Sequence, residues 1–385
     1  MGDVYRFVTA RNLSIVGGMS PDIAIGGYLT GGGHSPLSAT YGLAADQVLE
    51  MEVVTPQGEI LTVNECQNKD LFWALRGGGG STFGVMTSAT VRTFPVPSIG
   101  SSNLAVNFST PNSEAFWNST TFFHQQIPRL VNDGLSGYYY HQPFVSDPDG
   151  TCHSFFGGTF LIVNKTSQAA AKSLASIIEY INSTDPNEVS IQNFGLDFPT
   201  FYDFWFAFQD TSSVGYDSAM GSRLLNAEVL SVSFGSLMET IKAATPPDDD
   251  LLGGFGGNIV SGPGVWNASP RGGGNSVNPA WRNGTVDHIG ITVTFPPLNA
   301  TAREDKQHSL TSSYVEAVRK LAPHSGAYIN EADHNEPDYQ QAFWGDNYPR
   351  LLKIKREVDP EDVFWCHPCV GNERWHEVGN RLCRK

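Results

Sequence analysis

Apolar and polar residues alternate with a period of two along residues 48–54, which predicts a strand with one buried face. A Pro-Gln-Gly-Glu turn joins this segment to a second apolar stretch at residues 60–63, so the two form a predicted hairpin. Residues 70–76 have the pattern of a short helix that four glycines stop, and residues 83–94 return as a strand that is ended by prolines. These elements make up a first block, residues 1–98.

The next block, residues 99–337, contains two segments in which apolar residues recur at the spacing of an amphipathic helix, 170–181 and 310–321. Strands are predicted beside them at residues 159–163, 291–295 and 327–330, and glycine-rich loops at 248–257 and 271–274. This mixture indicates an α+β layer, an antiparallel sheet with helices packed on one face. Loops above such a sheet are where substrate contacts concentrate.

The last block, residues 338–385, opens on a basic amphipathic helix at residues 348–355, which is expected to end at Asp359 because a proline follows. Cys366 and Cys369 then stand at the CxxC spacing of a metal or redox motif. A thioredoxin-like site would lie between a strand and a helix start, and no second CxxC is present. A structural pair or buried free thiols are therefore favoured over metal or dithiol chemistry.

Two glycine-rich segments carry the clearest chemical signal, GGYLTGGGHS at residues 26–35 and RGGGGSTFGV at residues 76–85. As turns between strands, they would let backbone amides approach a ligand without a Cβ in the way, and clustered amides suit a pyrophosphate. Their spacing matches neither the Rossmann GxGxxG fingerprint nor the GxxxxGK[ST] phosphate loop. On the residues alone, a cofactor cradle and glycines required only for tight sheet turns remain alternatives.

Composition narrows the classes of function. Of the 385 residues, 40% are hydrophobic and 16% are charged, which is typical of a chain with a substantial core. The formal net charge of −15 argues against binding to nucleic-acid phosphates or to an anionic membrane surface. No apolar run reaches the roughly 18 residues of a membrane-spanning helix. We therefore expect a soluble, loop-rich enzyme with no nucleic-acid partner and no membrane partner.

Eight Asn-X-Ser/Thr sequons are present, where chance alone would give roughly four. They lie at Asn12, Asn107, Asn118, Asn164, Asn182, Asn267, Asn283 and Asn299. The excess predicts a secreted glycoprotein, with Asn107, Asn118 and Asn164 as the favoured glycan sites, and the alternative is that the sequons are accidental. Residues 1–18 show no export signal, so this prediction places the natural amino terminus upstream.

The sequence also resembles a known family. YGLAADQVL at residues 41–49 and DLFWALRGGG at residues 70–79 closely resemble the FAD-binding domain of the vanillyl-alcohol-oxidase superfamily. The tail segments WGDNYPRL (344–351) and DPEDVF (359–364) look like the C-terminal segment of berberine-bridge-enzyme-like members. GAYINEAD at residues 326–333 is similar to the fungal branch that includes isoamyl alcohol oxidases. The resemblance implies a two-domain α+β flavoprotein of the PCMH type, with FAD as its cofactor.

This resemblance also implies a domain order. Residues 1–98 would be the second half of the FAD-binding domain, 99–337 the substrate-binding domain, and 338–385 a berberine-bridge-like segment that returns to the FAD-binding domain. The family's earlier strand–helix subdomain, which carries a phosphate-cradling loop and the flavin-linked His, has no counterpart in this text. We therefore expect a truncated FAD-binding domain that holds FAD weakly or not at all.

Positions of the cofactor site follow from the same resemblance. FAD would contact Gly26, Gly27, Tyr28, Gly31, Gly32, Gly33, Phe83, Gly84, Val85 and Asn347, with substrate stacked over the flavin from the central sheet. Tyr28 stands where plant alkaloid enzymes have a His near the flavin, and its phenol can donate one hydrogen bond to the reduced ring. Ser20 replaces the Cys of bicovalent members, so the thioether link cannot form here.

Glu331 is the predicted catalytic base, because many relatives place a catalytic Tyr at the aligned position. Strand alternation at residues 327–331 would turn its side chain toward the flavin, and burial there would raise its pKa toward neutrality. The alternative is an ion pair of Glu331 with Arg350 or Lys353 that holds the two domains together. Tyr348 would then be the next candidate for the catalytic group.

Together these features predict an FAD-dependent oxidoreductase that oxidises a hydroxyl group of a small alcohol or secondary metabolite, with molecular oxygen as acceptor and without a metal. One alternative is an inactive or incomplete flavoprotein without bound FAD. Another is an extracellular glycoprotein that binds carbohydrate through its Trp and Tyr side chains, for which no motif is present.

Overall fold

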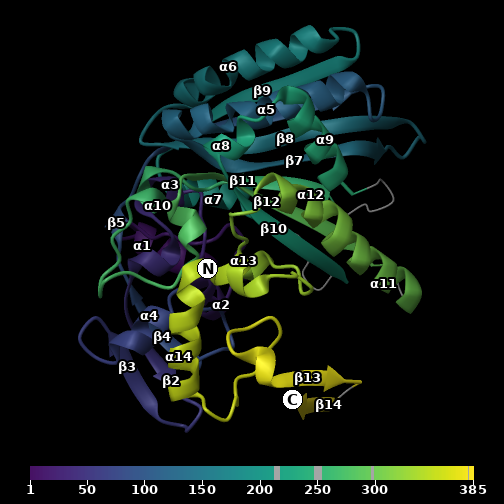
Figure 1. Cartoon of the computed structure of the whole chain (residues 1–385). Helices are drawn as coiled ribbons and strands as arrows, with labels where there is room; N and C mark the ends of the chain where they lie inside the picture. The colour runs from purple at the N-terminus through teal and green to yellow at the C-terminus, as the bar shows by residue number, and fades with distance from the viewer. Residues whose placement is uncertain (212–216, 247–253, 296–298, 380) are drawn as a thin grey trace.

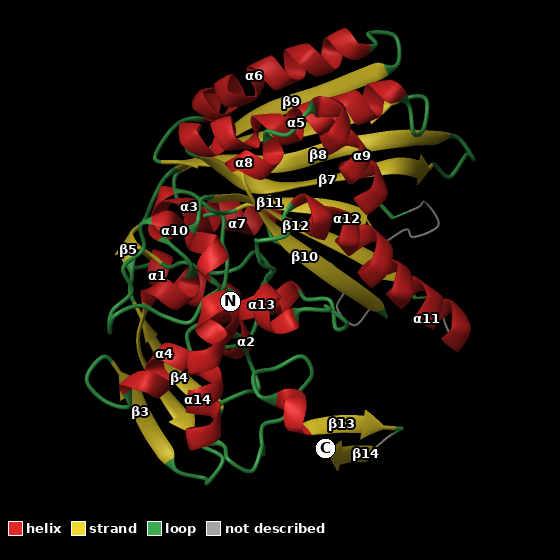
Figure 2. Cartoon of the chain, viewed as in Figure 1, coloured by secondary structure: helices red, strands yellow, loops and turns green. Residues whose placement is uncertain are grey.

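The computed structural model of the chain describes residues 1–211, 217–246, 254–295, 299–379 and 381–385. Two sheets dominate it, one of seven strands and one of three, and helices cover one face of the larger sheet (Figure 1, Figure 2). This architecture confirms the predicted α+β class. Within the described ranges, no helix combines the length and the apolar character that crossing a membrane requires.

The seven-stranded sheet has the order β10-β12-β11-β7-β8-β6-β9, and every neighbouring pair is antiparallel. Its strands are β6 (Ile99–Phe108), β7 (Leu135–Ser146), β8 (Cys152–Val163), β9 (Val189–Phe198), β10 (Ser218–Asn226), β11 (Gly254–Ile259) and β12 (Thr285–Thr294). The helices over one face are α5 (Glu114–Asp133), α6 (Ser167–Thr184), α9 (Phe234–Ala244) and α12 (Val315–Leu321) (Figure 1). The predicted helix at 170–181 and the predicted strand at 159–163 are confirmed by α6 and β8.

Strand alternation separates the side chains of the large sheet into two environments. In β12, Ile289, Ile291 and Val293 are buried in the core under the helices, and each such side chain stabilises the fold by roughly 1.5–3 kcal/mol. The intervening residues of β12, among them His288 and Gly290, face the opposite side, where Glu331 lies. The sheet therefore presents a second face that is free to build a site.

The smaller sheet has the order β3-β2-β4. Its strands are β2 (Val48–Val54), β3 (Ile60–Asn64) and β4 (Val85–Val91), and α4 (Lys69–Ala74) and α14 (Tyr348–Val358) lie beside it. β2 and β3 pair as the predicted hairpin. Met51, Phe72 and Leu351 share one buried core, so the C-terminal helix packs against the first block of the chain.

The remaining elements are shorter. The helices are α1 (Gly2–Thr9), α2 (Ile25–Gly31), α3 (Ser38–Tyr41), α7 (Phe201–Phe208), α8 (Ala227–Leu230), α10 (Pro263–Trp266), α11 (Ala300–Ser309) and α13 (Tyr339–Trp344). Single turns are η1 (Ala44–Gln47), η2 (Pro279–Arg282), the π-helical η3 (Leu310–Tyr314), η4 (Ile329–Glu331), η5 (Gly345–Asn347) and η6 (Asn372–Arg374). Two short ribbons pair β1 (Leu13–Ser14) with β5 (Phe94–Pro95) and β13 (Trp375–Val378) with β14 (Arg381–Arg384). The helix predicted at 310–321 is thus η3 followed by α12.

The tail also contains the paired cysteines. Cys366 and Cys369 form a disulfide, so they are a bonded pair rather than buried free thiols, and their sulfur atoms are not free thiolates for a metal. The Sγ atom of Cys366 lies 3.5 Å from the carbonyl oxygen of Ser81. The disulfide-linked turn therefore lies next to the second glycine-rich segment of the sequence.

Two predictions for glycine-rich segments of the chain are wrong. Residues 25–31 form helix α2 rather than a turn, because Tyr28 and Leu29 are buried in the core of the first block and stabilise a helical turn that the glycines alone would not favour. Residues 254–257, expected in a loop, belong to β11; a Cβ on Gly257 would lie 2.1 Å from Cζ of Tyr139, so only glycine lets that ring pack under the strand. Residues 248–253 of the same expected loop lie outside the described residues.

The strand predicted at residues 327–330 is also wrong. The backbone N–H of Ala327 donates to the carbonyl of Ala342, and the N–H of Glu331 donates to the carbonyl of Tyr328, which closes the 3-10 turn η4. The alternation argument for the orientation of Glu331 therefore fails, because a 3-10 turn does not send successive side chains to opposite faces.

Candidate active site

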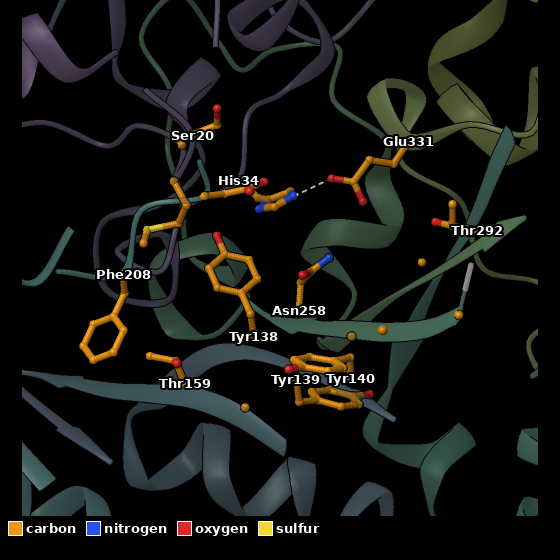
Figure 3. A pocket seen from close by; sticks show the side chains of 18 of the residues that line it. Ser20, His34, Tyr138, Tyr139, Tyr140, Thr159, Phe208, Asn258, Thr292 and Glu331 are labelled. Carbon is orange, nitrogen blue, oxygen red and sulfur yellow. Dashed lines mark hydrogen bonds and ion pairs between the residues drawn. The ribbon is translucent and has the colours of Figure 1, made fainter. Parts of the chain in front are cut away.

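A cavity of about 1290 Å³ opens between the free face of the large sheet and the segment around α2 (Figure 3). Three parts of the chain line it. The sheet contributes Asn103, Tyr138, Tyr140, Phe155, Phe194, Gly256, Asn258, Gly290 and Thr292. The N-terminal segment contributes Met19, Ser20, Gly27, Tyr28 and His34, and the segment around η4 contributes Tyr328, Asn330 and Glu331. Ordinary ligand pockets occupy roughly 300–1,000 Å³, so this cavity has room for a cofactor ring together with a substrate.

A row of polar side chains crosses the floor of the cavity. Asn258 on β11 is paired with His288 on β12 and with Tyr138 on β7, Tyr138 is paired with Thr159 on β8, and Thr159 with Asn103 on β6. Directly opposed residues of antiparallel strands point to the same face of a sheet. The register therefore assembles one polar strip from five strands. His288, which is fully buried, forms the end of this strip and lies next to Glu331.

Glu331 lies between two imidazoles. Its Oε1 atom is 2.8 Å from Nε2 of His34, and its Oε2 atom is 3.5 Å from Nε2 of His288 (Figure 3 shows the first contact). Nδ1 of His288 lies 2.9 Å from the amide nitrogen of Asn258. The three groups come from the segment after α2, from β12 and from η4, so the fold alone brings them together.

The charges of this cluster differ from the prediction. Burial by itself would raise the pKa of Glu331, but the neighbouring imidazoles of His288 and His34 outweigh it and lower this pKa to about 2. Burial lowers the pKa of His288 to about 4. The predicted upward shift for Glu331 is therefore wrong in direction, and at neutral pH an ionised carboxylate faces a neutral His288.

The alternative considered for Glu331, an ion pair with Arg350 or Lys353, is not formed. Arg350 pairs with Asp70 at 2.8 Å, and Lys353 lies 3.9 Å from Glu357 within its own helix. Glu331 instead contacts two histidines that the sequence interpretation did not single out. Its position at the cavity wall keeps it available to a bound molecule.

Two tyrosines hold the segment that carries His34. The Tyr28 hydroxyl donates to the carbonyl of His34 at 2.7 Å, and the backbone N–H of Gly33 donates to the Tyr328 hydroxyl at 3.0 Å. Asn330 donates to the same Tyr328 oxygen at 2.8 Å. Burial raises the pKa of Tyr28 well above its ordinary value, so its hydroxyl stays a donor, and in this structure that donor serves His34.

The residues predicted to contact FAD are spread over several places. Gly27 and Tyr28 line the cavity, and Gly26 precedes them on α2. Gly31, Gly32 and Gly33 lie behind the wall, where a Cβ on Gly31 would be 2.2 Å from the side chain of Asn330. Phe83 is fully buried, Gly84 packs on Val53, Val85 is exposed on β4, and Asn347 donates to the carbonyl of Val277. For the residues away from the cavity, a role in FAD binding remains a prediction.

Tyr348, the second catalytic candidate, lies in α14 and not at the cavity wall. Its hydroxyl donates to the carboxylate of Glu373, and burial raises its pKa.

Gly77, in the second glycine-rich segment, has a φ of +129°, and a Cβ there would lie 2.1 Å from the backbone nitrogen of Val277. At Gly77 the glycine is thus required by close backbone approach.

Sequence reasoning missed most of the polar cluster. His34 stood inside the GGYLTGGGHS text but no role was given to it, and His288 and Asn258 were not considered. The one available signal was the pair Asp287-His288 within a strand that otherwise holds Val, Ile, Gly and Thr, since buried ionisable residues in such a strand need partners. That signal does not say which partners they find.

Residues 1–64 match the family described as an FAD-binding domain, and residues 327–371 match the family described as berberine and berberine-like. An uncharacterised FAD-linked oxidoreductase of Arthroderma benhamiae is 34% identical, over 100% of this chain and 65% of its own length. The FAD-linked oxidoreductase patO of Aspergillus clavatus is also 34% identical, over 99% of this chain and 64% of its own. The chain spans slightly less than two thirds of the length of these curated relatives.

The VAO-type flavoprotein MtVAO713 of Myceliophthora thermophila has a solved structure that is 32% identical, with a TM-score of 0.92 over 100% of this chain and 67% of that one. The chain belongs to the VAO-type flavoprotein family. Membership confirms the resemblance to FAD-linked, berberine-bridge-like proteins and identifies FAD as the cofactor of this VAO-type chain. A carbohydrate oxidase of Microdochium nivale, 19% identical with a TM-score of 0.70, shares the fold alone.

The cavity of this VAO-type chain fits a flavin. A Cβ added to Gly26 or Gly27 would meet no atom within 4 Å, so a flat ring can approach the backbone there. The buried amide oxygen of Asn103 has no hydrogen-bond partner and could accept from a bound ring. Gly27, Tyr28 and Ser20 at the wall would hold the ring, with Asn103 on the floor.

Proposed function

We propose that this VAO-type chain is an FAD-dependent oxidoreductase that oxidises a hydroxyl group of a small alcohol or secondary metabolite, with molecular oxygen as the acceptor. The observation that carries the proposal is the position of the Glu331 carboxylate, which lies between His34 and His288 at the wall of a cavity large enough for both flavin and substrate. Its relatives are named FAD-linked oxidoreductases, which supports the assignment to redox enzymes.

Oxidation of an alcohol removes a proton from oxygen and a hydride from carbon. FAD, when bound, supplies the acceptor for the hydride. Glu331 accepts the hydroxyl proton because its oxygens reach the cavity. A carboxylate whose pKa is about 2 does not keep this proton, so it passes on to the imidazole of His34, which lies 2.8 Å away. His34 holds Oε1 of this carboxylate at 2.8 Å, and Tyr28 holds the backbone of His34 in turn. Tyr138, Tyr140, Phe155 and Phe194 on the sheet side of the cavity favour a substrate with an apolar body.

A spectroscopic experiment tests this function. Protein reconstituted with FAD, in enough excess to load the weakly binding truncated domain that the sequence predicts, is expected to show the visible flavin absorbance. It is expected to lose this absorbance anaerobically with at least one compound from a panel of aliphatic and benzylic alcohols, and to regain it when oxygen is admitted. A protein that takes up no FAD would favour the incomplete-flavoprotein alternative. A loaded protein that no hydroxyl compound bleaches would show that hydroxyl oxidation is wrong.

We also propose that the protein enters a secretory pathway. The side chains of Asn164, Asn182 and Asn299 are exposed, whereas Asn107 on β6 and Asn118 on α5 are half-buried. Glycans need solvent, so we expect them at the exposed sequons and not at these two.

Protein from a eukaryotic host is expected to lose mass on enzymatic deglycosylation, and Asn164→Gln is expected to remove one glycan. Asn118→Gln serves as the matched control, because it deletes a half-buried sequon and should leave the mass of the glycans unchanged. A mass unaffected by deglycosylation would argue that the protein does not pass through a secretory pathway.

A further inference from the structure

Two histidines and one glutamate converge at the cavity wall with the atoms that metals bind. One imidazole nitrogen of His34, one of His288 and a carboxylate oxygen of Glu331 all lie within 4.8 Å of one another. Two imidazole nitrogens and one carboxylate oxygen form a common ligand set for zinc and neighbouring divalent ions when one position is left open.

A second observation points to a ligand at this place. Nε2 of His288 belongs to a wholly buried side chain, faces Glu331 and has no hydrogen-bond partner in the described part of the chain. A buried polar atom without a partner costs roughly 1–3 kcal/mol, so natural proteins rarely leave one unexplained. A cation in front of this nitrogen would satisfy it.

The spacing of the donor atoms suits one ion. Zinc binds nitrogen and oxygen at about 2.0–2.2 Å in a tetrahedron, which separates two ligand atoms by about 3.4 Å. Nε2 of His34 lies 2.8 Å from Oε1 of Glu331, and Nε2 of His288 lies 3.5 Å from Oε2, so the two separations lie on either side of that value. An ion at this place would therefore lie between the two imidazoles and contact the carboxylate through one or both oxygens.

We infer that His34, His288 and Glu331 form a binding site for a divalent cation of the zinc type, with its open position toward the cavity. Asn258 is the supporting residue, since it contacts Nδ1 of His288. For Nε2 to bind the ion, Nδ1 carries the proton and donates to the amide oxygen of Asn258, which requires only that the amide turns over.

The cation competes with the proposed reaction. Glu331 cannot ligate an ion and accept a hydroxyl proton with the same lone pairs, so the bound cation inhibits oxidation. This consequence rests on the proposed function, whereas binding itself does not. The site thus makes the enzyme sensitive to divalent ions of the zinc type.

Binding is measured first, without activity. FAD-free protein titrated with Co²⁺ is expected to develop the visible absorption of tetrahedral Co²⁺ at one equivalent per chain, and Zn²⁺ is expected to displace it. His288→Gln and Glu331→Gln are each expected to weaken binding at least about 100-fold, and Asn258→Ala about 10–100-fold. His308→Gln, an exposed histidine on α11, is the matched control and should bind as the parent does.

Circular dichroism and thermal unfolding show whether each variant is folded, and binding is compared only among folded ones. Absence of the Co²⁺ spectrum in the parent, or an equal spectrum in folded Glu331→Gln, overturns the cation site. With FAD loaded, Zn²⁺ is expected to inhibit at the concentrations at which it binds. Binding without inhibition would contradict the role of Glu331 in the proposed function and leave the cation site standing.

Discussion

In the FAD-loaded protein, Glu331→Gln is expected to slow reduction of the flavin by substrate about 10²-fold or more. Glutamine keeps the size of the side chain and can still hydrogen-bond to His34, but it cannot accept the hydroxyl proton. FAD content should be unchanged, because the carboxylate contacts His34 and His288 rather than the glycine-lined wall. Anaerobic rapid mixing, followed by the visible flavin absorbance, measures the rate.

The matched control is Glu357→Gln, which removes one carboxylate from an exposed pair with Lys353 on α14. It is expected to reduce flavin at the parent's rate. Glu331→Asp keeps the charge but withdraws it from the cavity, and should give an intermediate rate. A parent-like rate in Glu331→Gln, with only a lower unfolding temperature, would show that Glu331 has a structural role.

Asp359→Asn is expected to lower the free energy of unfolding by about 3–5 kcal/mol, because it leaves a buried ammonium without its counter-charge. Lys355 is buried and donates to Asp359 at 2.7 Å and to the carbonyls of Thr82 and Phe364 at 2.8 Å. Asp359 also accepts from the backbone N–H groups of Val363 and Phe364. The Lys355–Asp359 pair thus joins α14 to the tail at Val363 and Phe364 and to Thr82 in the second glycine-rich segment.

The effect has a defined pH dependence. Burial opposes ionisation of Asp359, but Lys355 and the backbone N–H groups of Phe364 and Val363 together outweigh it, so the pKa of Asp359 lies below its ordinary value. The native carboxylate therefore stabilises the fold fully above about pH 4, where the unfolded Asp is also ionised, and loses this contribution as the pH falls through the lower native pKa. The gap between parent and variant should narrow on acidification.

Chemical denaturation measures both effects, with Glu357→Gln as the exposed control, which should change stability by less than about 0.5 kcal/mol. The double variant Lys355→Met, Asp359→Leu is expected to recover part of the loss, because it removes both charges together. A loss for Asp359→Asn no larger than that of the control would contradict the structural role of this pair.

This ion pair explains part of what the sequence predicted. The tail text DPEDVF was recognised as a family segment, and the structure shows that its first aspartate caps the backbone of Val363 and Phe364 and neutralises Lys355. The helix at 348–355 was predicted from its amphipathic spacing and extends to Val358 in α14. Local periodicity is enough for such elements because burial of one face is decided within a few turns.

Predictions failed at glycine-rich and short segments, where contacts with distant parts of the chain decide the local structure. Residues 327–330 alternate like a strand, but the N–H of Ala327 donates to the carbonyl of Ala342 and the N–H of Glu331 donates to that of Tyr328, which closes a turn. The strand prediction therefore gave Glu331 the wrong surroundings and the wrong direction of pKa shift. The glycines of α2 were taken for a turn, although the buried side chains of Tyr28 and Leu29 decide for a helix. In each case long-range packing outweighed a weak local preference.

The sequence by itself determined the α+β class, the β2–β3 hairpin, the main amphipathic helices and the membership of a flavin-binding family, because these depend on local periodicity and on contiguous motifs. Only the tertiary structure decided the site. Glu331 and His34 are 297 positions apart, and His288 reaches them through the register of β12 in a seven-stranded sheet. Register and loop packing depend on contacts between distant segments, and no pattern within a single segment encodes them.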